Sequence, residues 1–176
     1  MLDQYLNKGL KTKSFSKGEI LQRAGELNNK VFIVKKGLLR SYIIDEKGKE
    51  HIYMFASESW VTSDVEAQAF NNKTVLFIDA LEDSEVYMLD ASELTPNISN
   101  VDEYNIAINA LMRRMGVMQR RILALLSASA RERYESFLEI YPELPNRVPQ
   151  KMIAAYLGIT PEALSAIRSR MAKNES

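Results

Sequence analysis

Apolar residues recur alternately every four and every three positions between residues 100 and 128. This is the spacing of positions a and d in a coiled coil, in which two helices wind around each other. The seam residues are Tyr104, Ile108, Leu111, Met115, Met118, Ile122 and Leu125. The core helix of a monomer can carry the same pattern. We interpret residues 100–128 as a long dimerisation helix whose seam contacts the same seam in a second copy of the chain.

Before this helix, short runs rich in β-branched and aromatic residues alternate with turns that contain glycine. The runs lie at residues 20–21, 31–34, 38–44, 50–55, 75–78 and 85–89. The stretch 45–48 ends on Gly48 and suits a type I turn that joins two strands of a hairpin. Many short strands separated by turns predict an antiparallel sandwich or barrel for residues 1–99.

After the long helix, residues 129–176 show the signals of a compact set of helices. Ser129 and Glu132 form a capping box, which predicts a helix from about Ala130 up to Tyr141. Pro149 suits the first position of a helix over 150–157, and Gly158 suits the turn that follows it. Thr160 is a good cap for a second amphipathic helix. Two short helices joined by a turn at 157–160 predict a helix-turn-helix, although an αα-hairpin that only packs is the alternative.

The second of these helices would carry the residues that face a DNA groove. They are Thr160, Glu162, Ser165, Arg168 and Ser169. A second set would contact the phosphate backbone, because its side chains donate hydrogen bonds or carry positive charge. It comprises Arg147, Gln150, Lys151, Arg170 and Lys173. No strand is recognisable after this helix, so we expect a helix-turn-helix without a wing.

Charge is strongly partitioned although the chain as a whole is neutral. Residues 1–40 carry nine Lys/Arg and three Asp/Glu, residues 41–105 carry three and fourteen, and residues 106–176 carry eleven and six. An acidic middle followed by a basic end suits a protein whose C-terminal part meets a polyanion. Ordinary solvated surface is the alternative explanation of the same charges.

Composition excludes several kinds of chemistry. The chain has no Cys, so disulfides, iron–sulfur clusters and thiolate metal sites are excluded, and His51 is its only histidine. A single His cannot supply the ligand set of a metal-dependent barrel enzyme. We therefore expect no enzyme, no metal and no cofactor. The absence of a long apolar run or signal peptide predicts a cytoplasmic protein that does not enter a membrane.

Several motifs resemble the Crp/Fnr family of bacterial transcription regulators. The stretches 141–144, 147–151 and 155–165, the last reading AYLGITPEALS, are similar to the helix-turn-helix of members from Bacteroidetes-like bacteria, and 15–21 and 34–37 resemble the opening of the family's β-roll. The resemblance implies an α+β protein with a jelly-roll-like cyclic-nucleotide-binding roll, a dimerisation helix and a DNA-reading end. It also implies a palindromic DNA operator, a small-molecule effector and RNA polymerase as partners.

The chain departs from the family in the region that resembles the effector pocket. In members that bind cyclic AMP, an arginine clamps the cyclic phosphate, yet no arginine occurs here between Arg40 and Arg113. We therefore expect an effector other than cyclic AMP, or a pocket filled by the chain itself. The candidate pocket residues are Phe55, Glu58, Trp60, Lys73 and Thr74.

A second departure lies in the recognition helix. Pro161 and Ala166 stand where the family often has arginines, so phosphate contacts are fewer and the DNA target is not implied. The sequence as a whole predicts a homodimeric, DNA-binding transcription regulator. The alternatives are a ligand-sensing or protein-interaction module whose C-terminal helices do not read DNA, and a jelly-roll enzyme.

Overall fold

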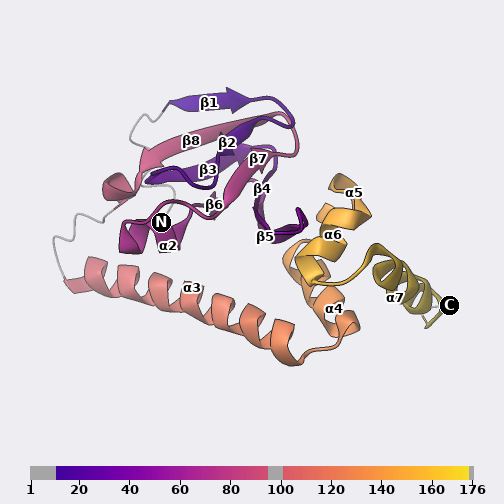
Figure 1. Cartoon of the computed structure of the whole chain (residues 1–176). Helices are drawn as coiled ribbons and strands as arrows, with labels where there is room; N and C mark the ends of the chain where they lie inside the picture. The colour runs from indigo at the N-terminus through magenta and orange to yellow at the C-terminus, as the bar shows by residue number, and fades with distance from the viewer. Residues whose placement is uncertain (1–10, 95–100, 175–176) are drawn as a thin grey trace. The chain divides into compact units, whose positions relative to one another are not determined.

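The computed structural model describes residues 11–94 and 101–174, which belong to two compact units. The N-terminal unit extends to residue 95 and contains the strands, and the C-terminal unit begins at residue 96 and contains the long helix and those that follow it (Figure 1). The three-part division into 1–99, 100–128 and 129–176 stays a prediction, and its first boundary lies outside the described residues.

Two four-stranded antiparallel sheets form the N-terminal unit. The first sheet has the order β1 (Thr12–Phe15), β8 (Ser84–Asp90), β3 (Lys30–Lys36) and β6 (Val61–Thr62). The second has the order β2 (Ile20–Gln22), β7 (Phe77–Ala80), β4 (Leu39–Ile44) and β5 (Glu50–Ala56). The expected jelly-roll-like antiparallel architecture is confirmed, as two sheets that do not close into a barrel.

Four elements of this unit were not predicted, and one strand begins later than expected. β1, β6 and the helix α2 (Val65–Phe70) are additional, and the short helix η1 (Ala91–Leu94) follows β8. The run 75–78 enters the sheet only at Phe77, because the N–H groups of Val75 and Leu76 donate to the carboxylate of Asp64, at 2.8 and 3.0 Å.

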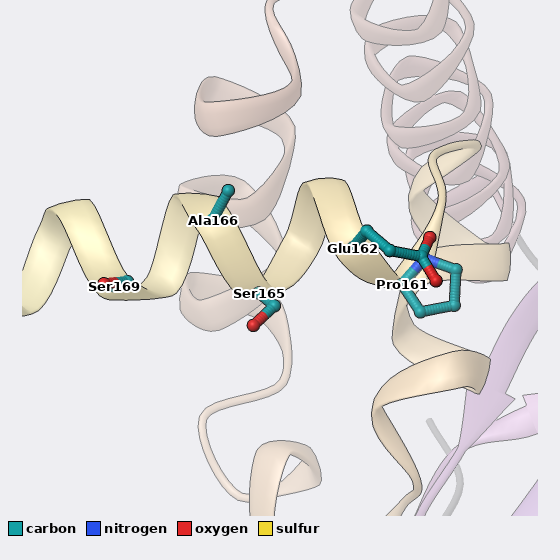
Figure 2. Close-up of a pocket in the computed structure, with 5 residues that line it drawn as sticks. All are labelled: Pro161, Glu162, Ser165, Ala166 and Ser169. Carbon is teal, nitrogen blue, oxygen red and sulfur yellow. The ribbon is translucent and has the colours of Figure 1, made fainter.

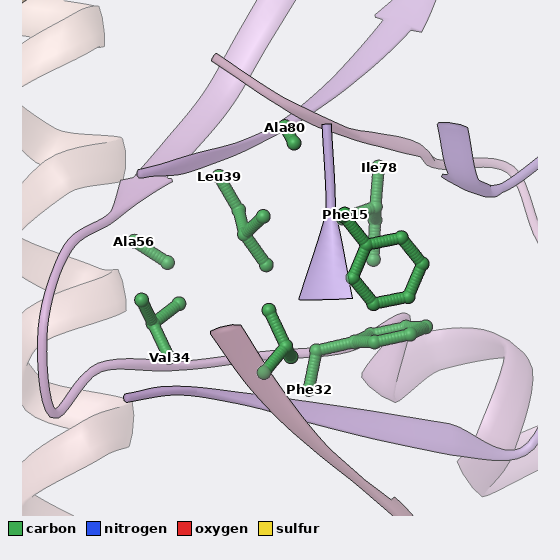
Figure 3. Packing of buried hydrophobic residues seen from close by; sticks show 8 residues of the cluster. Phe15, Phe32, Val34, Leu39, Ala56, Ile78 and Ala80 are labelled. Atoms are coloured by element: carbon green, nitrogen blue, oxygen red, sulfur yellow. The ribbon is translucent and has the colours of Figure 1, made fainter. Parts of the chain in front are cut away.

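The core of the roll lies between the two sheets. Its buried residues come from both sheets, as Figure 3 shows: they are Phe15, Phe32, Val34, Leu39, Ala56, Ile78, Ala80 and Val86. Trp60 packs against this cluster from the loop that precedes β6. Alternation along each strand directs these side chains inward and their neighbours outward, which is why single-residue shifts in register are costly.

The predicted hairpin turn between β4 and β5 is confirmed. Gly48 has a φ of +77°, and the carboxylate of Asp45 accepts from the N–H groups of Lys47 and Lys49, both at 2.9 Å. The Nε2 atom of His51 lies 2.8 Å from Oδ2 of Asp45. This hydrogen bond, together with those from the backbone, lowers the pKa of Asp45. The side chain of the chain's single histidine therefore supports this turn from the start of β5.

Five helices form the described C-terminal unit. They are α3 (Val101–Ser127), α4 (Ala130–Ile140), α5 (Leu144–Arg147), α6 (Gln150–Leu157) and α7 (Pro161–Asn174). The capping box is confirmed, since Glu132 N–H donates to Ser129 Oγ and Ser129 N–H donates to Glu132, at 3.2 and 2.7 Å. α5 was not predicted. Pro149 precedes α6 as its N-cap rather than occupying its first position, because its ψ of 144° is extended.

Candidate nucleic-acid interface and effector region

The turn between α6 and α7 has the geometry of a helix-turn-helix. Gly158 ends α6 in the left-handed region, with φ of +69°, and Ile159 N–H donates to the carbonyl of Ala154 at 3.0 Å. Ala163 N–H donates to Oγ1 of Thr160 at 3.2 Å, so the hydroxyl caps α7 as predicted. Pro161 is the first residue of α7, where its missing N–H costs no hydrogen bond.

Buried apolar side chains fix α6 and α7 against α4. Ile153, Leu157 and Leu164 are almost completely buried, and the ring of Tyr156 lies 5.4 Å from that of Phe137. Leu164 therefore marks the inner face of α7. Because a helix buries one stripe, the opposite stripe of α7 is left for another molecule.

The outer face of α7 carries an open hollow of about 520 Å³ (Figure 2). It is lined by Pro161, Glu162, Ser165, Ala166 and Ser169. Three of the residues predicted to face DNA, Glu162, Ser165 and Ser169, thus lie together. Thr160 is also exposed, but it acts as the cap of the helix, and Arg168 is half-buried and does not line the hollow.

The hollow is acidic at the end where α7 begins. Its lining residues include one charged side chain, Glu162, and the pKa of Glu162 is lowered by its own backbone N–H and by the hydroxyl of Thr160. Glu162 is therefore ionised and can only accept hydrogen bonds. In a major groove its possible donors are the amino groups of cytosine and adenine.

The residues predicted to contact phosphates surround this face unequally. Gln150 and Lys151 are exposed at the start of α6, and Arg170 and Lys173 are exposed on the second half of α7. Arg147 is half-buried and donates from Nη1 to Glu143 at 3.3 Å, so a carboxylate already neutralises part of its charge. No side chain caps α6, so its first N–H groups point outward, as they do at anion-binding helix ends.

The predicted effector residues have different surroundings. Trp60 packs against the core cluster, whereas Phe55 lies on the other face of β5 from Met54 and Ala56, which belong to that core. Glu58 accepts from the N–H of Gly37 at 2.9 Å, and Lys73 is exposed.

Thr74, the fifth predicted effector residue, is buried and bonded internally. Its Oγ1 donates to the carbonyl of Arg23 at 2.8 Å, and its N–H donates to the carbonyl of Glu26 at 2.9 Å. Its hydroxyl therefore ties the segment before β7 to the loop between β2 and β3. Neither its hydroxyl hydrogen nor its backbone N–H is left for a ligand.

Asp64 is a central residue of this region that the sequence did not reveal. It is 2% exposed, and its carboxylate accepts from the N–H groups of Ala67, Val75 and Leu76 at 3.1, 2.8 and 3.0 Å. These bonds cap α2 and join it to the segment before β7. An Asp directly before a short helix is a recognisable N-cap signal, but its two distant partners have no local signature.

The predicted dimer seam is a row of large apolar side chains on α3. Tyr104, Leu111, Met115, Met118, Ile122 and Leu125 are between 45 and 56% exposed, and Ile108 is half-buried. Exposed apolar patches of this extent are uncommon on monomeric proteins and mark interaction sites.

Metal binding and membrane insertion find no support in the part of the chain that the structure describes. No group of three or more His, Asp or Glu among residues 11–94 and 101–174 is placed to hold a metal ion. Within the same ranges, no helix is long and apolar enough to cross a membrane.

Comparison with known proteins gives consistent matches. The family described as "cyclic nucleotide-binding domain" matches residues 12–99. Electron transport regulator A of Shewanella oneidensis is 26% identical over 179 residues, which cover 92% of this chain and 69% of that protein.

Similar solved structures extend the match to the C-terminal helices. FixK2 of Bradyrhizobium japonicum has a TM-score of 0.75 at 21% identity, covering 94% of this chain and 86% of its own. A mutant of CooA from Carboxydothermus hydrogenoformans has a TM-score of 0.72 at 21% identity, covering 96% and 79%. A transcriptional regulator of the CRP/FNR family from Thermus thermophilus has a TM-score of 0.70 at 19% identity, covering 93% and 87%. These matches establish a shared fold.

Proposed function

We propose that this chain regulates transcription by binding DNA as a homodimer. The proposal follows from two facts: the chain belongs to the cyclic nucleotide-binding domain family, and it has the fold of the Crp/Fnr transcription regulators. It would act in the cytoplasm, where α7 of each copy would enter the major groove of one half of a palindromic operator. RNA polymerase would be its partner at the promoter. Two-fold symmetry would place the half-sites about one helical turn apart.

The observation that carries this proposal is the outer face of α7. The turn at Gly158 and the buried Leu164 hold α7 so that its exposed face carries Glu162 and the short side chains of Ser165, Ala166 and Ser169. Short side chains let a helix approach base edges closely, and Lys151 and Arg170 on either side are placed for phosphates.

Selection from a random-sequence DNA pool tests this proposal. We expect enrichment of a palindrome and an affinity that falls roughly a hundredfold or more between about 50 and 200 mM salt, because phosphate contacts release counterions. Arg168→Ala should weaken binding by roughly 1–3 kcal/mol and reduce the enrichment. Arg131→Ala is the matched control, since it removes an equal charge from the surface of α4, where Arg131 pairs with Glu135.

Weak binding without enrichment, equal in both variants, would contradict the proposal. It would favour a protein-interaction module, the alternative that the acidic residue in the first turn of α7 supports. In that case Glu162 would face a basic partner rather than a base amino group.

We further propose that cyclic AMP is not the effector. No arginine occurs between Arg40 and Arg113, the hydroxyl of Thr74 donates to the backbone carbonyl of Arg23, and the carboxylate of Asp64 already accepts from three N–H groups. Isothermal calorimetry of the full chain with cyclic AMP should show no binding tighter than about 1 mM, which corresponds to roughly 4 kcal/mol. Micromolar binding would overturn this prediction. An effector of lower negative charge, or none, would fit the region.

A further inference from the structure

One side chain of the long helix holds the helix-turn-helix at two points. The guanidinium of Arg121 on α3 lies 3.7 Å from the ring centre of Tyr156 on α6, and its Nη2 donates to the carbonyl oxygen of Tyr156 at 3.2 Å. Arg121 is half-buried. A planar guanidinium can stack on a ring and donate at its edge at once, which an ammonium cannot do.

Tyr156 is itself fixed within the helical core. It is 8% exposed, and its ring lies 5.4 Å from Phe137 and 5.7 Å from Tyr141, the latter edge-on. Both partners belong to α4 or its C-terminal cap. Arg121 therefore contacts a residue of α6 that is packed firmly against α4.

A second residue close to the helix-turn-helix lies one helical turn further along α3. A Cβ placed on Gly158 would lie 3.9 Å from Cδ2 of Leu125, so this leucine borders the turn that leads into α7. Arg121 and Leu125 are four residues apart and share a face of α3. Leu125 is also the last residue of the predicted dimer seam. The end of α3 that would meet a partner thus also lies beside the turn before the recognition helix.

We propose that Arg121 is a positioning residue, which fixes the direction of α7 relative to the dimerisation helix and thereby selects the separation of the two half-sites. The inference rests on the proposed function, because the separation has meaning only for a DNA-binding dimer. In such a dimer each α3 is paired with its copy, so the angle between α3 and α7 determines the distance between the two recognition helices. A loosened angle would let the dimer accept several separations.

The DNA test uses a set of duplexes that carry the selected half-sites at different separations, and one duplex with a single half-site. The parent chain should prefer one separation. In Arg121→Ala, the ratio of affinities for the preferred and the other separations should fall about tenfold, which is within the usual range of coupling between sites. Its affinity for the single half-site should equal that of the parent chain. Arg121→Lys should lose it as well, because it keeps the charge but not the planar fork. Arg120→Ala, an equal charge change at an exposed neighbour, should keep it.

A distance measurement without DNA separates this inference from the proposed function. The chain has no cysteine, so Asn109→Cys and Ser169→Cys allow spin labels on α3 and α7 of one copy, diluted with unlabelled chain. Pulsed electron resonance should give a narrow distance distribution, which Arg121→Ala and Arg121→Lys broaden and Arg120→Ala does not. If the Arg121 variants broaden the distribution but the parent chain binds no DNA, the positioning role of Arg121 would be supported and only the proposed DNA-binding function would be refuted. A narrow distribution in both Arg121 variants would overturn the inference.

Discussion

Arg40→Ala is expected to lower the free energy of unfolding of the N-terminal unit by about 3 kcal/mol, the usual loss when one partner of a buried ion pair is removed. Arg40 and Asp79 are each 7% exposed and face each other on β4 and β7. Nε donates to Oδ1 at 2.8 Å and Nη2 donates to Oδ2 at 2.9 Å. Burial alone lowers the pKa of Arg40, but the hydrogen bonds to Asp79 and Glu50 outweigh burial and raise it. The substitution leaves the carboxylate of Asp79 buried and without this cation.

Urea denaturation followed by the fluorescence of Trp60, which packs against the core of the roll, measures this loss in the N-terminal unit. Lys35→Ala is the matched control, because Lys35 pairs with Glu85 at 2.8 Å with both side chains at least 40% exposed, and such pairs contribute roughly 0–1 kcal/mol. Joint replacement, Arg40→Met with Asp79→Leu, should recover most of the stability, since no buried charge is then left uncompensated. An Arg40→Ala loss no larger than that of Lys35→Ala would show that the pair contributes little.

Ile122→Lys is expected to convert the protein to a monomer. Ile122 lies in the predicted seam of α3 and is 55% exposed, so the new lysines would face each other across a two-fold axis without a counter-charge. Sedimentation at micromolar concentration should show the shift from dimer to monomer. Affinity for a full operator should fall by roughly a hundredfold, because the second half-site is no longer bound by a linked copy.

Val117→Lys provides the control for this substitution. Val117 is 59% exposed on the same helix but lies outside the seam. Val117→Lys therefore also replaces a β-branched apolar residue by lysine, at similar exposure. It should leave the protein dimeric. Dissociation by both variants would show that the dimer does not use the predicted seam, and dissociation by neither would contradict a dimer through α3.

The elements that could be predicted are those with local signals. Ser129 and Glu132 are three residues apart, and the turn around Gly158 follows from a glycine between two amphipathic runs. β1 and β6 were missed because four and two residues carry too little periodicity to be recognised. Their pairing depends on strands that are distant in the sequence.

The contacts that join distant residues could not be predicted. Arg40 and Asp79 are 39 residues apart, and they meet only because β4 pairs with β7 in one register. Asp64 accepts from the N–H groups of Val75 and Leu76, which lie beyond the whole length of α2, and no local pattern indicates this pairing. Phe55 and Trp60 are close in sequence, yet strand alternation assigns Phe55 to the face away from the core against which Trp60 packs.

Trp60 has a spectroscopic consequence. It is the only tryptophan of the chain, and it packs against the core of the roll. Light at wavelengths too long for tyrosine to absorb excites only Trp60, so the emission reports on the N-terminal unit alone. The far-ultraviolet circular dichroism signal, in contrast, is dominated by the helices of the other unit. Comparison of the two signals during unfolding would reveal whether the units melt together. The same emission would report an effector at the roll without any attached dye.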